Sequence, residues 1–253
     1  MKISIITISY NSSKTISETI QSVVKQNYED LEYIVIDGQS TDNTDEIIRS
    51  YSYSGKITKY INEKDNGIYD AMNKGITHAT GDIIGFLNAD DIYAKNNVLK
   101  KVSQIFKKED PDSCYGDLVY VDSKHTNHVI RYWKSDYYNI RNFYLGWMPP
   151  HPTFFVKRSI FLKHGLFNTD LTIASDYELM IRFLNKNRIS THYIPEVLVK
   201  MRAGGVSNKN LKHLIKKTTQ DYKAWKINEL PGAPLAILLK NLRKIPQFFI
   251  KYH

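Results

Sequence analysis

The first hundred residues alternate between apolar runs that suit β-strands and amphipathic stretches that suit helices. Strands are predicted at 2–9, 31–37, 56–65 and 82–90. Apolar residues recur at helical spacing within 12–26 and 68–79, and turn and cap residues precede Ile47 and Ile48. Strands that alternate with helices favour a mostly parallel sheet with helices on both faces, so we expect an α/β fold.

The pattern changes beyond residue 110. We expect antiparallel strands at 113–122 and 128–133, a shaped loop containing three prolines at 141–156, helices at 158–164 and 176–187, and an extended segment at 190–202. The chain from Lys209 onward is helical and basic in character. The predicted organisation is one globular domain over 1–207, in two parts that meet near residue 110, and a helical extension over 208–253.

Charge and cysteine content narrow the class of protein. Residues 1–200 hold 24 basic and 24 acidic side chains, whereas 201–253 hold 11 and 2, so the net charge of +9 lies in the last fifth of the chain. A basic tail favours phosphate groups, on nucleic acid or on a membrane surface, but the balanced body argues against nucleic acid. One cysteine, Cys114, excludes an intramolecular disulfide and fits a cytoplasmic location. The apolar run at the N-terminus has no cleavage site after it and is expected to form a core strand.

Polar residues follow the apolar runs at the point where each predicted strand ends. In an open parallel sheet, ligands bind beyond the carboxyl ends of the strands. Carboxylates after three different strands should therefore meet at one edge. The residues at these ends are Thr7, Ser9, Tyr10 and Asn11, then Asp37 and Gly38, then Asp65, Asn66 and Gly67, and finally Asn88, Asp90 and Asp91.

The adjacent acids in "GFLNADD" indicate a cation site or a solvated turn, which also favours Asp and Asn. No GxGxxG follows the first strand and no GxxxxGK[ST] occurs, which disfavours nicotinamide oxidoreductases and P-loop NTPases. Carboxylates near a phosphate ligand favour Mg²⁺ or Mn²⁺, and a diphosphate leaving group needs such a Lewis acid.

Three blocks of sequence carry a family resemblance. "ITISYNSSKTISETIQSVVKQNYEDLEYIVIDGQSTDNT", "KDNGIYDAMNKGITHATGDIIGFLNADD" and "ASDYELMIRF" together resemble family 2 glycosyltransferases with the GT-A fold, over roughly residues 1–205. The resemblance implies a mostly parallel nucleotide-binding sheet flanked by helices in 1–110, and a smaller antiparallel, acceptor-binding part in 111–207. It also implies a nucleotide-diphosphate sugar donor, Mn²⁺ or Mg²⁺, and inversion at the anomeric carbon.

The resemblance also assigns residues to the donor site. Asp90 occupies the last position of the family's DxD motif and would bind the metal, with Asp91 assisting directly or from behind. Asn88 stands where many members have the first Asp, so the motif reads NxD here. The other residues implied in donor binding are Thr7, Tyr10, Asn11, Asp37, Asp65, Asn73, Lys74, Ala89, His151 and Arg202.

Most of these residues also have an ordinary structural explanation. Asp37 and Asp65 are common residue types in turns and caps, and Lys74 is a helical lysine that solvent alone could satisfy. Tyr10 could pack in the core, and His151 lies between prolines in a packed loop. Arg202, Gly204, Gly205 and Ser207 in "MRAGGVS" resemble a mobile loop over the donor phosphates.

Acceptor binding and proton removal are implied by a second group of residues. In "ASDYE", Asp176 matches the family's catalytic base, which takes the proton of the acceptor hydroxyl. Many relatives have Glu where this chain has Ser175, so Glu178 is the remaining candidate for a supporting carboxylate. Asp176 could instead cap its helix. Trp147 either stacks on a sugar of the acceptor or packs in the core.

Together these features predict a metal-dependent, inverting glycosyltransferase. It would move a sugar, most simply from UDP, to a saccharide or polyprenyl-linked saccharide during O-antigen, capsule or exopolysaccharide synthesis at the inner face of the cytoplasmic membrane. The tail either lies on the membrane, packs on the domain or forms a homodimer contact. A sugar-phosphate nucleotidyltransferase would need a glycine-rich N-terminal loop, and a non-catalytic saccharide- or lipid-binding module would not need Asp90 and Asp176.

Overall fold

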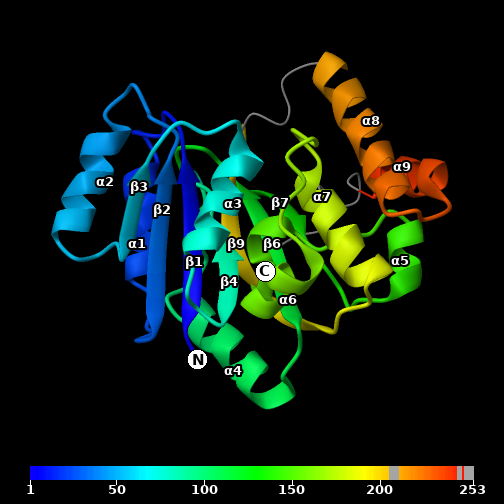
Figure 1. Ribbon diagram of the computed structural model, residues 1–253, viewed down its shortest axis with the longest axis horizontal. Helices are drawn as coiled ribbons and strands as arrows, with labels where there is room; N and C mark the ends of the chain where they lie inside the picture. Colours follow the sequence, from blue (N-terminus) through cyan, green and yellow to red (C-terminus); the bar gives the residue numbers. More distant parts are fainter. Residues whose placement is uncertain (205–210, 244–246, 248–253) are drawn as a thin grey trace.

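The computed structural model describes residues 1–204, 211–243 and 247, which form helices on both faces of one sheet (Figure 1). Within these residues the sheet order is β3-β2-β1-β4-β8-β6-β9-β5, and β7 pairs with β6. The strands are β1 (Ile3–Ser9), β2 (Leu31–Asp37), β3 (Lys59–Asn62), β4 (Ile83–Phe86), β5 (Ile92–Tyr93), β6 (Ser113–Val121), β7 (Val129–Trp133), β8 (Phe155–Lys157) and β9 (Thr191–Arg202). The α-helices are α1 (Ile16–Val24), α2 (Thr44–Tyr53), α3 (Ile68–His78), α4 (Val98–Glu109), α5 (Ile140–Tyr144), α6 (Arg158–His164), α7 (Ser175–Met180), α8 (Leu211–Ile227) and α9 (Ala233–Leu242).

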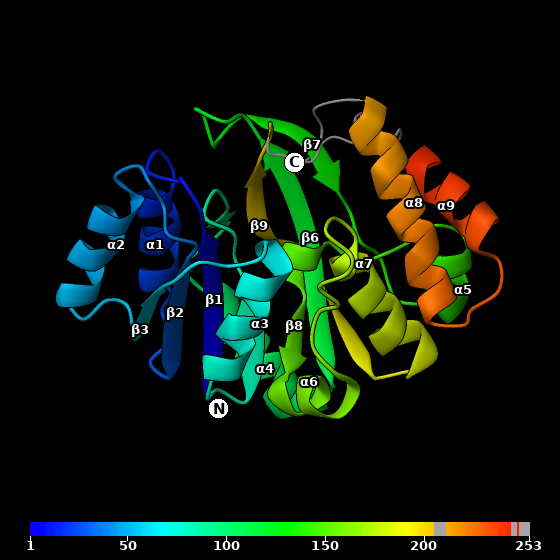
Figure 2. The same cartoon turned by 45° about the horizontal axis from the view of Figure 1, so that its top comes forward.

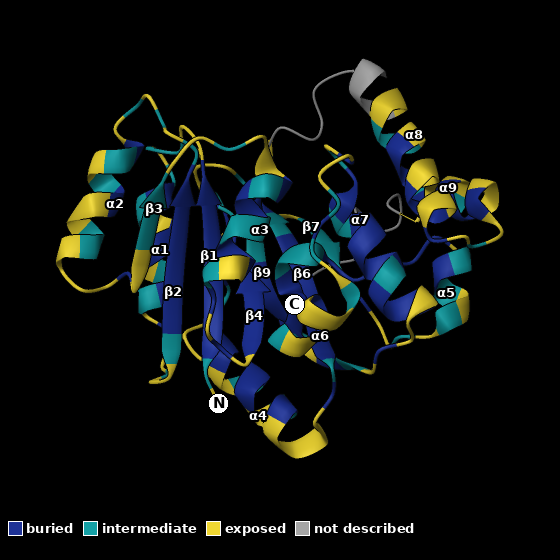
Figure 3. Cartoon of the chain, viewed as in Figure 1, coloured by how far each residue is buried: buried dark blue, intermediate teal, exposed yellow. Residues whose placement is uncertain are grey.

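The first half of the sheet is parallel, as its sequence predicts. β1 pairs in parallel with β2 and β4, and β2 pairs in parallel with β3. Alternate residues of β1 enter different cores: Ile3 and Ile5 face α1, α2 and α4, whereas Ile6 and Ile8 face α3. This two-sided burial is visible as the dark central strands of Figure 3. It explains why these strands are continuous apolar runs.

The second half is mixed, and one part of its prediction is wrong. The antiparallel pairing of β6 with β7 is confirmed, and β9 runs parallel to β6. The stretch 141–156, expected to be a loop throughout, begins within α5 and holds a 3₁₀ turn, η1 (His151–Thr153). It then enters β8, which lies antiparallel between β4 and β6. A β-carbon at Gly85 would lie 2.5 Å from the Phe155 ring, so the missing side chain in β4 admits this strand.

The C-terminal helices α8 and α9 pack on the body of the protein. In Figure 2, α8 lies beside α7 and α9 lies beside α5. Trp225 and Ala236 are completely buried and belong to the same apolar cluster as side chains of α3 and α7. The described part of the extension is therefore a packed element of the fold. None of the described helices combines the length and apolar character needed to span a membrane.

Candidate active site

The ends of β1 and β2 form one wall of the candidate site. Asp37 is the last residue of β2, lies beside Ser9, and accepts hydrogen bonds from the backbone nitrogen (2.8 Å) and Oγ (2.6 Å) of Ser40. Asn11 has a positive φ of 50°, and its Oδ1 accepts from the backbone nitrogen of Thr41 at 2.8 Å. Asp37 and Asn11 thus shape the loop that follows β2, and this loop stands at the predicted sheet edge.

Asp65 and Tyr10 lie at the same edge. A β-carbon at Gly38 would collide with a carboxylate oxygen of Asp65 and contact the ring of Tyr10 at 3.5 Å, so the two side chains flank this glycine. Tyr10 is 62% exposed, which rules out core packing and leaves its ring available to a ligand. The sheet edge therefore brings Tyr10, Asp37 and Asp65 together, as their positions after separate strands indicate.

Thr7, Asn73 and Lys74, which the sequence assigns to donor binding, have partners within the protein. Thr7 is fully buried within β1, because residue 7 faces the α1 side of the sheet. Its Oγ1 accepts a hydrogen bond from the Tyr33 hydroxyl at 3.1 Å. The Asn73 amide makes two hydrogen bonds of 2.9 Å with the backbone of Phe167. Both side chains therefore have partners within the protein, and their assignment to the donor site stays a prediction.

Lys74 is occupied by local acids. Its ammonium group forms ion pairs with Glu63 (3.1 Å) and Asp70 (3.5 Å), and it donates to the carbonyl of Lys64 at 2.7 Å. These contacts raise the pKa of Lys74 against the opposing effect of burial. The charge that was assigned to donor phosphates is therefore neutralised within the protein.

The turn after β4 places two carboxylates and an amide together. The backbone nitrogen of Asp91 donates to the Asn88 carbonyl at 3.0 Å, and Asn88 Nδ2 donates to Asp91 Oδ2 at 3.1 Å across Ala89 and Asp90. Burial raises the pKa of both Asp90 and Asp91, and the charge of Asp90 raises that of Asp91 further. Two repelling acids in this turn cost stability unless a cation accompanies them.

The oxygen atoms of this turn fit a hard cation. Among the described residues, Asn88 Oδ1 and Asp91 Oδ1 are buried and accept no hydrogen bond. Each is an oxygen ligand of the type that Mg²⁺ and Mn²⁺ prefer. No cluster of three or more His, Cys, Asp or Glu side chains occurs in the described ranges, so a cation here would need further oxygens from a ligand such as a diphosphate.

Arg202 holds this turn in place. Its buried guanidinium donates to the Asp90 carbonyl at 2.7 Å and to the Ser123 carbonyl at 3.2 Å, and it forms an ion pair with Glu18 of α1. With its donors directed at these groups, Arg202 supports Asp90 and does not present a free charge to phosphate. Gly204 ends the described segment with a φ of +102°, whereas Gly205 and Ser207 lie outside the described residues.

Asp176 faces the same region from α7. Its Oδ1 accepts from the hydroxyl of Tyr69 at 3.0 Å, and that hydroxyl also lies 2.9 Å from the Ile173 carbonyl. Burial and then the charge of Asp176 raise the pKa of Tyr69 well above its usual value, so the phenol stays protonated and donates. The N-cap of α7 is Ala174 and has no side-chain cap bond, so Asp176 does not cap the helix.

His151 lies beside the end of β4, and the charge of Asp176 influences the pKa of both His151 and Tyr120. His151 stacks on Phe86, the last residue of β4, at 5.6 Å, and burial lowers its pKa although the nearby Asp176 opposes this. Its imidazole is therefore neutral near pH 7. Burial raises the pKa of Tyr120, and the nearby guanidinium of Arg131 opposes this rise, whereas the charges of Asp91 and Asp176 add to it.

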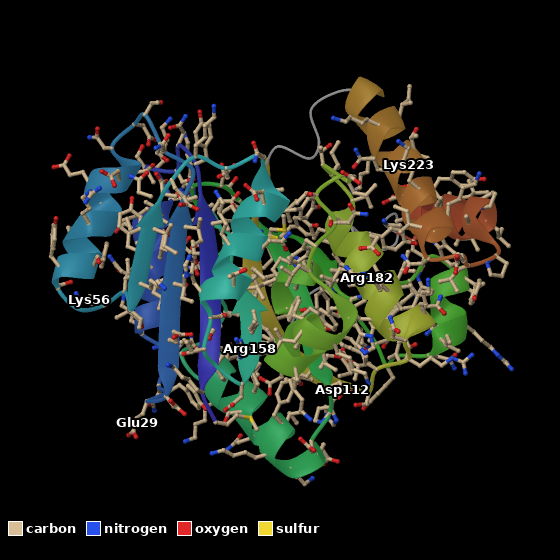
Figure 4. All side chains as sticks on the ribbon, in the orientation of Figure 1. Glu29, Lys56, Asp112, Arg158, Arg182 and Lys223 are labelled. Carbon is tan, nitrogen blue, oxygen red and sulfur yellow. The ribbon has the colours of Figure 1, made fainter. Side chains whose placement is uncertain are left out.

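The two other residues assigned to acceptor binding are structural. Trp147 is 4% exposed, and its Nε1 donates to the Ser135 carbonyl at 2.5 Å. Glu178 is buried and bound through both carboxylate oxygens to Arg182 at 3.0 Å. Figure 4 labels Arg182 on the helical turn that continues α7. Both side chains therefore pack within the protein, as the core alternative for Trp147 expects, and their assignment to acceptor binding stays a prediction.

The sequence did not single out Tyr69, Tyr120 or Glu18, although each contacts or influences the candidate site. Tyr69 lies inside the block "DNGIYDAMNKG", four residues after Asp65. Its place in that block is the sequence signal that marks it as a candidate site residue. Glu18 follows a helical pattern and looks like an ordinary exposed acid. Only the fold brings it to Arg202.

The fold and the strand-end site define a class of protein. A curled, mostly parallel sheet with acidic residues at its carboxyl edge is the GT-A fold of glycosyltransferases, and solved structures of that class superimpose on this chain. TarS of S. aureus in complex with UDP covers 93% of this chain and 68% of its own, with a TM-score of 0.68 and 18% identity. A mannosyltransferase from Pyrobaculum calidifontis, solved with GDP-Man and Mn²⁺, covers 98% and 73%, with a TM-score of 0.65 and 17% identity.

The sequence then gives the family. The model described as "Glycosyl transferase family 2" matches residues 4–165, and the chain belongs to this family. A PGL/p-HBAD biosynthesis glycosyltransferase of Mycobacterium bovis is 28% identical over 208 residues, covering 81% of this chain and 78% of the relative. An uncharacterized glycosyltransferase of Rickettsia felis is 29% identical over 79% of this chain, which spans about a third (34%) of that longer relative.

Proposed function

We propose that this protein is a metal-dependent, inverting glycosyltransferase that uses a nucleotide-diphosphate sugar, with UDP as the nucleotide. The observation that carries the proposal is the turn after β4, where Asp90 and Asp91 are adjacent and where Asn88 Oδ1 and Asp91 Oδ1 are buried without a hydrogen-bond partner. Asp176 accepts from Tyr69 of α3, the helix that begins just after Asp65. Family membership and the nucleotide-bound structural neighbours support it. The saccharide acceptor would be lipid-linked, in a pathway for a bacterial surface polysaccharide.

Each residue has a distinct task in this mechanism. Asp90, Asp91 and Asn88 would hold the cation, which, when bound, neutralises charge on the departing diphosphate. Tyr10, Asp37 and Asp65 would contact the nucleoside. The Tyr69 hydroxyl holds Asp176 Oδ1, which leaves Oδ2 to accept the proton of the acceptor hydroxyl as the glycosidic bond forms. The neutral His151 would line the space for the transferred sugar without adding charge.

A panel of nucleotide diphosphates tests the donor proposal. In thermal-shift measurements with Mn²⁺, UDP should raise the melting temperature, and UDP with chelator should not, because the binding free energy stabilises only the folded chain. GDP and ADP serve as matched controls with the same diphosphate. Equal stabilisation by all three would refute the UDP preference, and stabilisation by UDP that survives chelation would refute the cation.

The outer face of α9 supports a membrane location for the acceptor. Leu235, Leu238 and Leu242 recur on one helical face and are 58%, 58% and 49% exposed. The outward side of α9 appears exposed in Figure 3. Among the described side chains from residue 215 to 243, four exposed cations outnumber one exposed acid, Glu229. Leucines beside an excess of cations suit the headgroup layer of an anionic bilayer, and we place the enzyme at the inner face of the cytoplasmic membrane.

Vesicle binding tests this membrane surface. Changing Leu235 and Leu238 to serine should lower the affinity for phosphatidylglycerol vesicles about tenfold or more, because each leucine loses apolar burial in the bilayer. Flotation measures the bound fraction. Leu162→Ser on α6, at an equally exposed leucine (68%), is the matched control. Unchanged flotation of the double variant would exclude α9 as the contact and leave homodimerisation as the use of this face.

A further inference from the structure

The two C-terminal helices make a series of polar contacts with one short segment, residues 172–178. Gln220 of α8 accepts from the backbone nitrogen of Ile173 at 2.7 Å through Oε1, and its Nε2 donates to Thr172 Oγ1 at 3.0 Å. Asn228, the residue that follows α8, donates to Glu178 Oε1 at 3.1 Å. The two ends of the segment that contains Asp176 are therefore bound to α8 and to the residue that follows it.

Tyr177, the neighbour of Asp176, is held from two directions. The Nε1 of Trp225 donates to its hydroxyl at 2.9 Å. The ammonium group of Lys240 in α9 lies 3.3 Å from the centroid of its ring, and pairs with Asp221 of α8 at 2.9 Å. Lys240 and Asp221 are both buried. A buried ion pair adds little stability compared with apolar side chains of similar size, so its value here is the fixed geometry around Tyr177.

The opposite side of the segment is held by the donor half. The single hydroxyl proton of Tyr69 is shared between Ile173 carbonyl and Asp176 Oδ1. Ile173 is thus fixed at its nitrogen by Gln220 and at its carbonyl by Tyr69. Figure 2 shows α7 between α3 on one side and α8 on the other. The position of Asp176 consequently depends on α8 and α9 as well as on the sheet.

We propose that α8 and α9 position the catalytic base, with Gln220 and Trp225 as positioning residues for Asp176. This inference rests on the proposed role of Asp176 in transfer. The C-terminal helices then have a task in the reaction that is separate from any contact with a membrane. A base displaced by about 1 Å from its productive geometry loses up to about 100-fold in rate, whereas donor binding at the strand ends is unaffected.

Gln220→Leu in the full chain tests the proposal, because leucine keeps most of the volume but leaves the Ile173 nitrogen without its acceptor. Amide exchange of the peptide spanning 172–178 should become at least about tenfold faster, and kcat for transfer should fall about 10- to 100-fold. UDP binding and exchange of β1 should stay unchanged. Thr219→Ala, which removes the hydrogen bond from an exposed neighbour to the Ile215 carbonyl, is the matched control.

Trp225→Phe provides a second variant, since it removes the indole donor to Tyr177 and keeps an aromatic ring. Slower transfer with faster exchange in either folded variant supports the proposal. Normal exchange of 172–178, or normal kcat despite faster exchange, overturns it. Asp176→Asn in the same experiment distinguishes failure of the base assignment from failure of the positioning role. Full transfer by Asp176→Asn shows that Asp176 is not the base, whatever the amide exchange rate measured in Gln220→Leu.

Discussion

Asp176→Asn is expected to retain the nucleotide-sugar donor with its normal affinity and to lose about 10²- to 10⁴-fold in transfer rate, the usual contribution of a general base. Asparagine has the size of aspartate, and its oxygen can still accept from the Tyr69 hydroxyl at 3.0 Å. The amide cannot take a proton from the acceptor hydroxyl. The fold and the donor half should therefore remain intact while the chemical step slows.

Donor binding and transfer must be measured separately to interpret this variant. Calorimetric titration with UDP measures donor binding, and single-turnover transfer to the acceptor measures the rate of the chemical step. Asp170→Asn is the matched control, because Asp170 is an exposed acid six residues earlier in the same stretch. A normal single-turnover rate in Asp176→Asn would show that Asp176 of α7 is not the catalytic base. Loss of UDP binding would instead indicate that the charge of Asp176 supports the donor site.

The strand-end residues could be predicted because their positions depend on local chain direction. Apolar runs fix the strands, and the carboxyl ends of parallel strands must share one edge, so the sequence predicts Asp37, Asp65 and Asp90 at that edge. Alternation along one strand decides which side chains reach the edge. Thr7 accepts a hydrogen bond from Tyr33 in the core, and an apolar run that is buried on both faces gives no signal of that direction.

Side chains with long-range partners could not be assigned from the sequence. Trp147 donates to a carbonyl 12 residues away, and Asn73 binds Phe167, which is 94 residues away. Each looks equally suited to a ligand until its partner is known. Lys74 is a local case, since Glu63 and Asp70 lie close in sequence, but only the turn before α3 brings Glu63 to its ammonium group.

The C-terminal extension shows a similar limit. Its composition predicted helices and a basic surface, and periodicity cannot decide which apolar face packs inward when α9 has apolar residues on two sides. Ala236 and Ile237 are buried, whereas Leu235 and Leu238 are exposed. The buried Lys240 was counted with the basic surface, yet it pairs with Asp221 inside the protein. Tertiary packing therefore divides one basic helix into a structural face and an exposed face.

Asp90→Ala is expected to reduce Mn²⁺-dependent binding of UDP at least about 100-fold, because even the loss of a residue that only supports a ligand costs 10- to 100-fold in metal affinity. Asp90 is the half-exposed acid of the turn, whereas Asp91 is fully buried behind it. Removing Asp90 leaves the backbone carbonyl that Arg202 binds at 2.7 Å, so the turn should keep its shape. The loss should therefore reflect the missing carboxylate.

Titration of UDP with and without Mn²⁺ measures this effect as the ratio of two affinities. Asp82→Ala is the control for loss of charge, because Asp82 is an exposed acid just before β4, the strand that leads into the Asp90 turn. Asn88→Ala adds a discriminating comparison, since Asn88 contributes an oxygen but no charge. If Asp90→Ala keeps the Mn²⁺ dependence and Asn88→Ala loses it, the cation lies on the amide side of the turn. If only Asp90→Ala loses it, the negative charge of Asp90 holds the cation, and the asparagine that replaces the family's first acid is free to serve the donor.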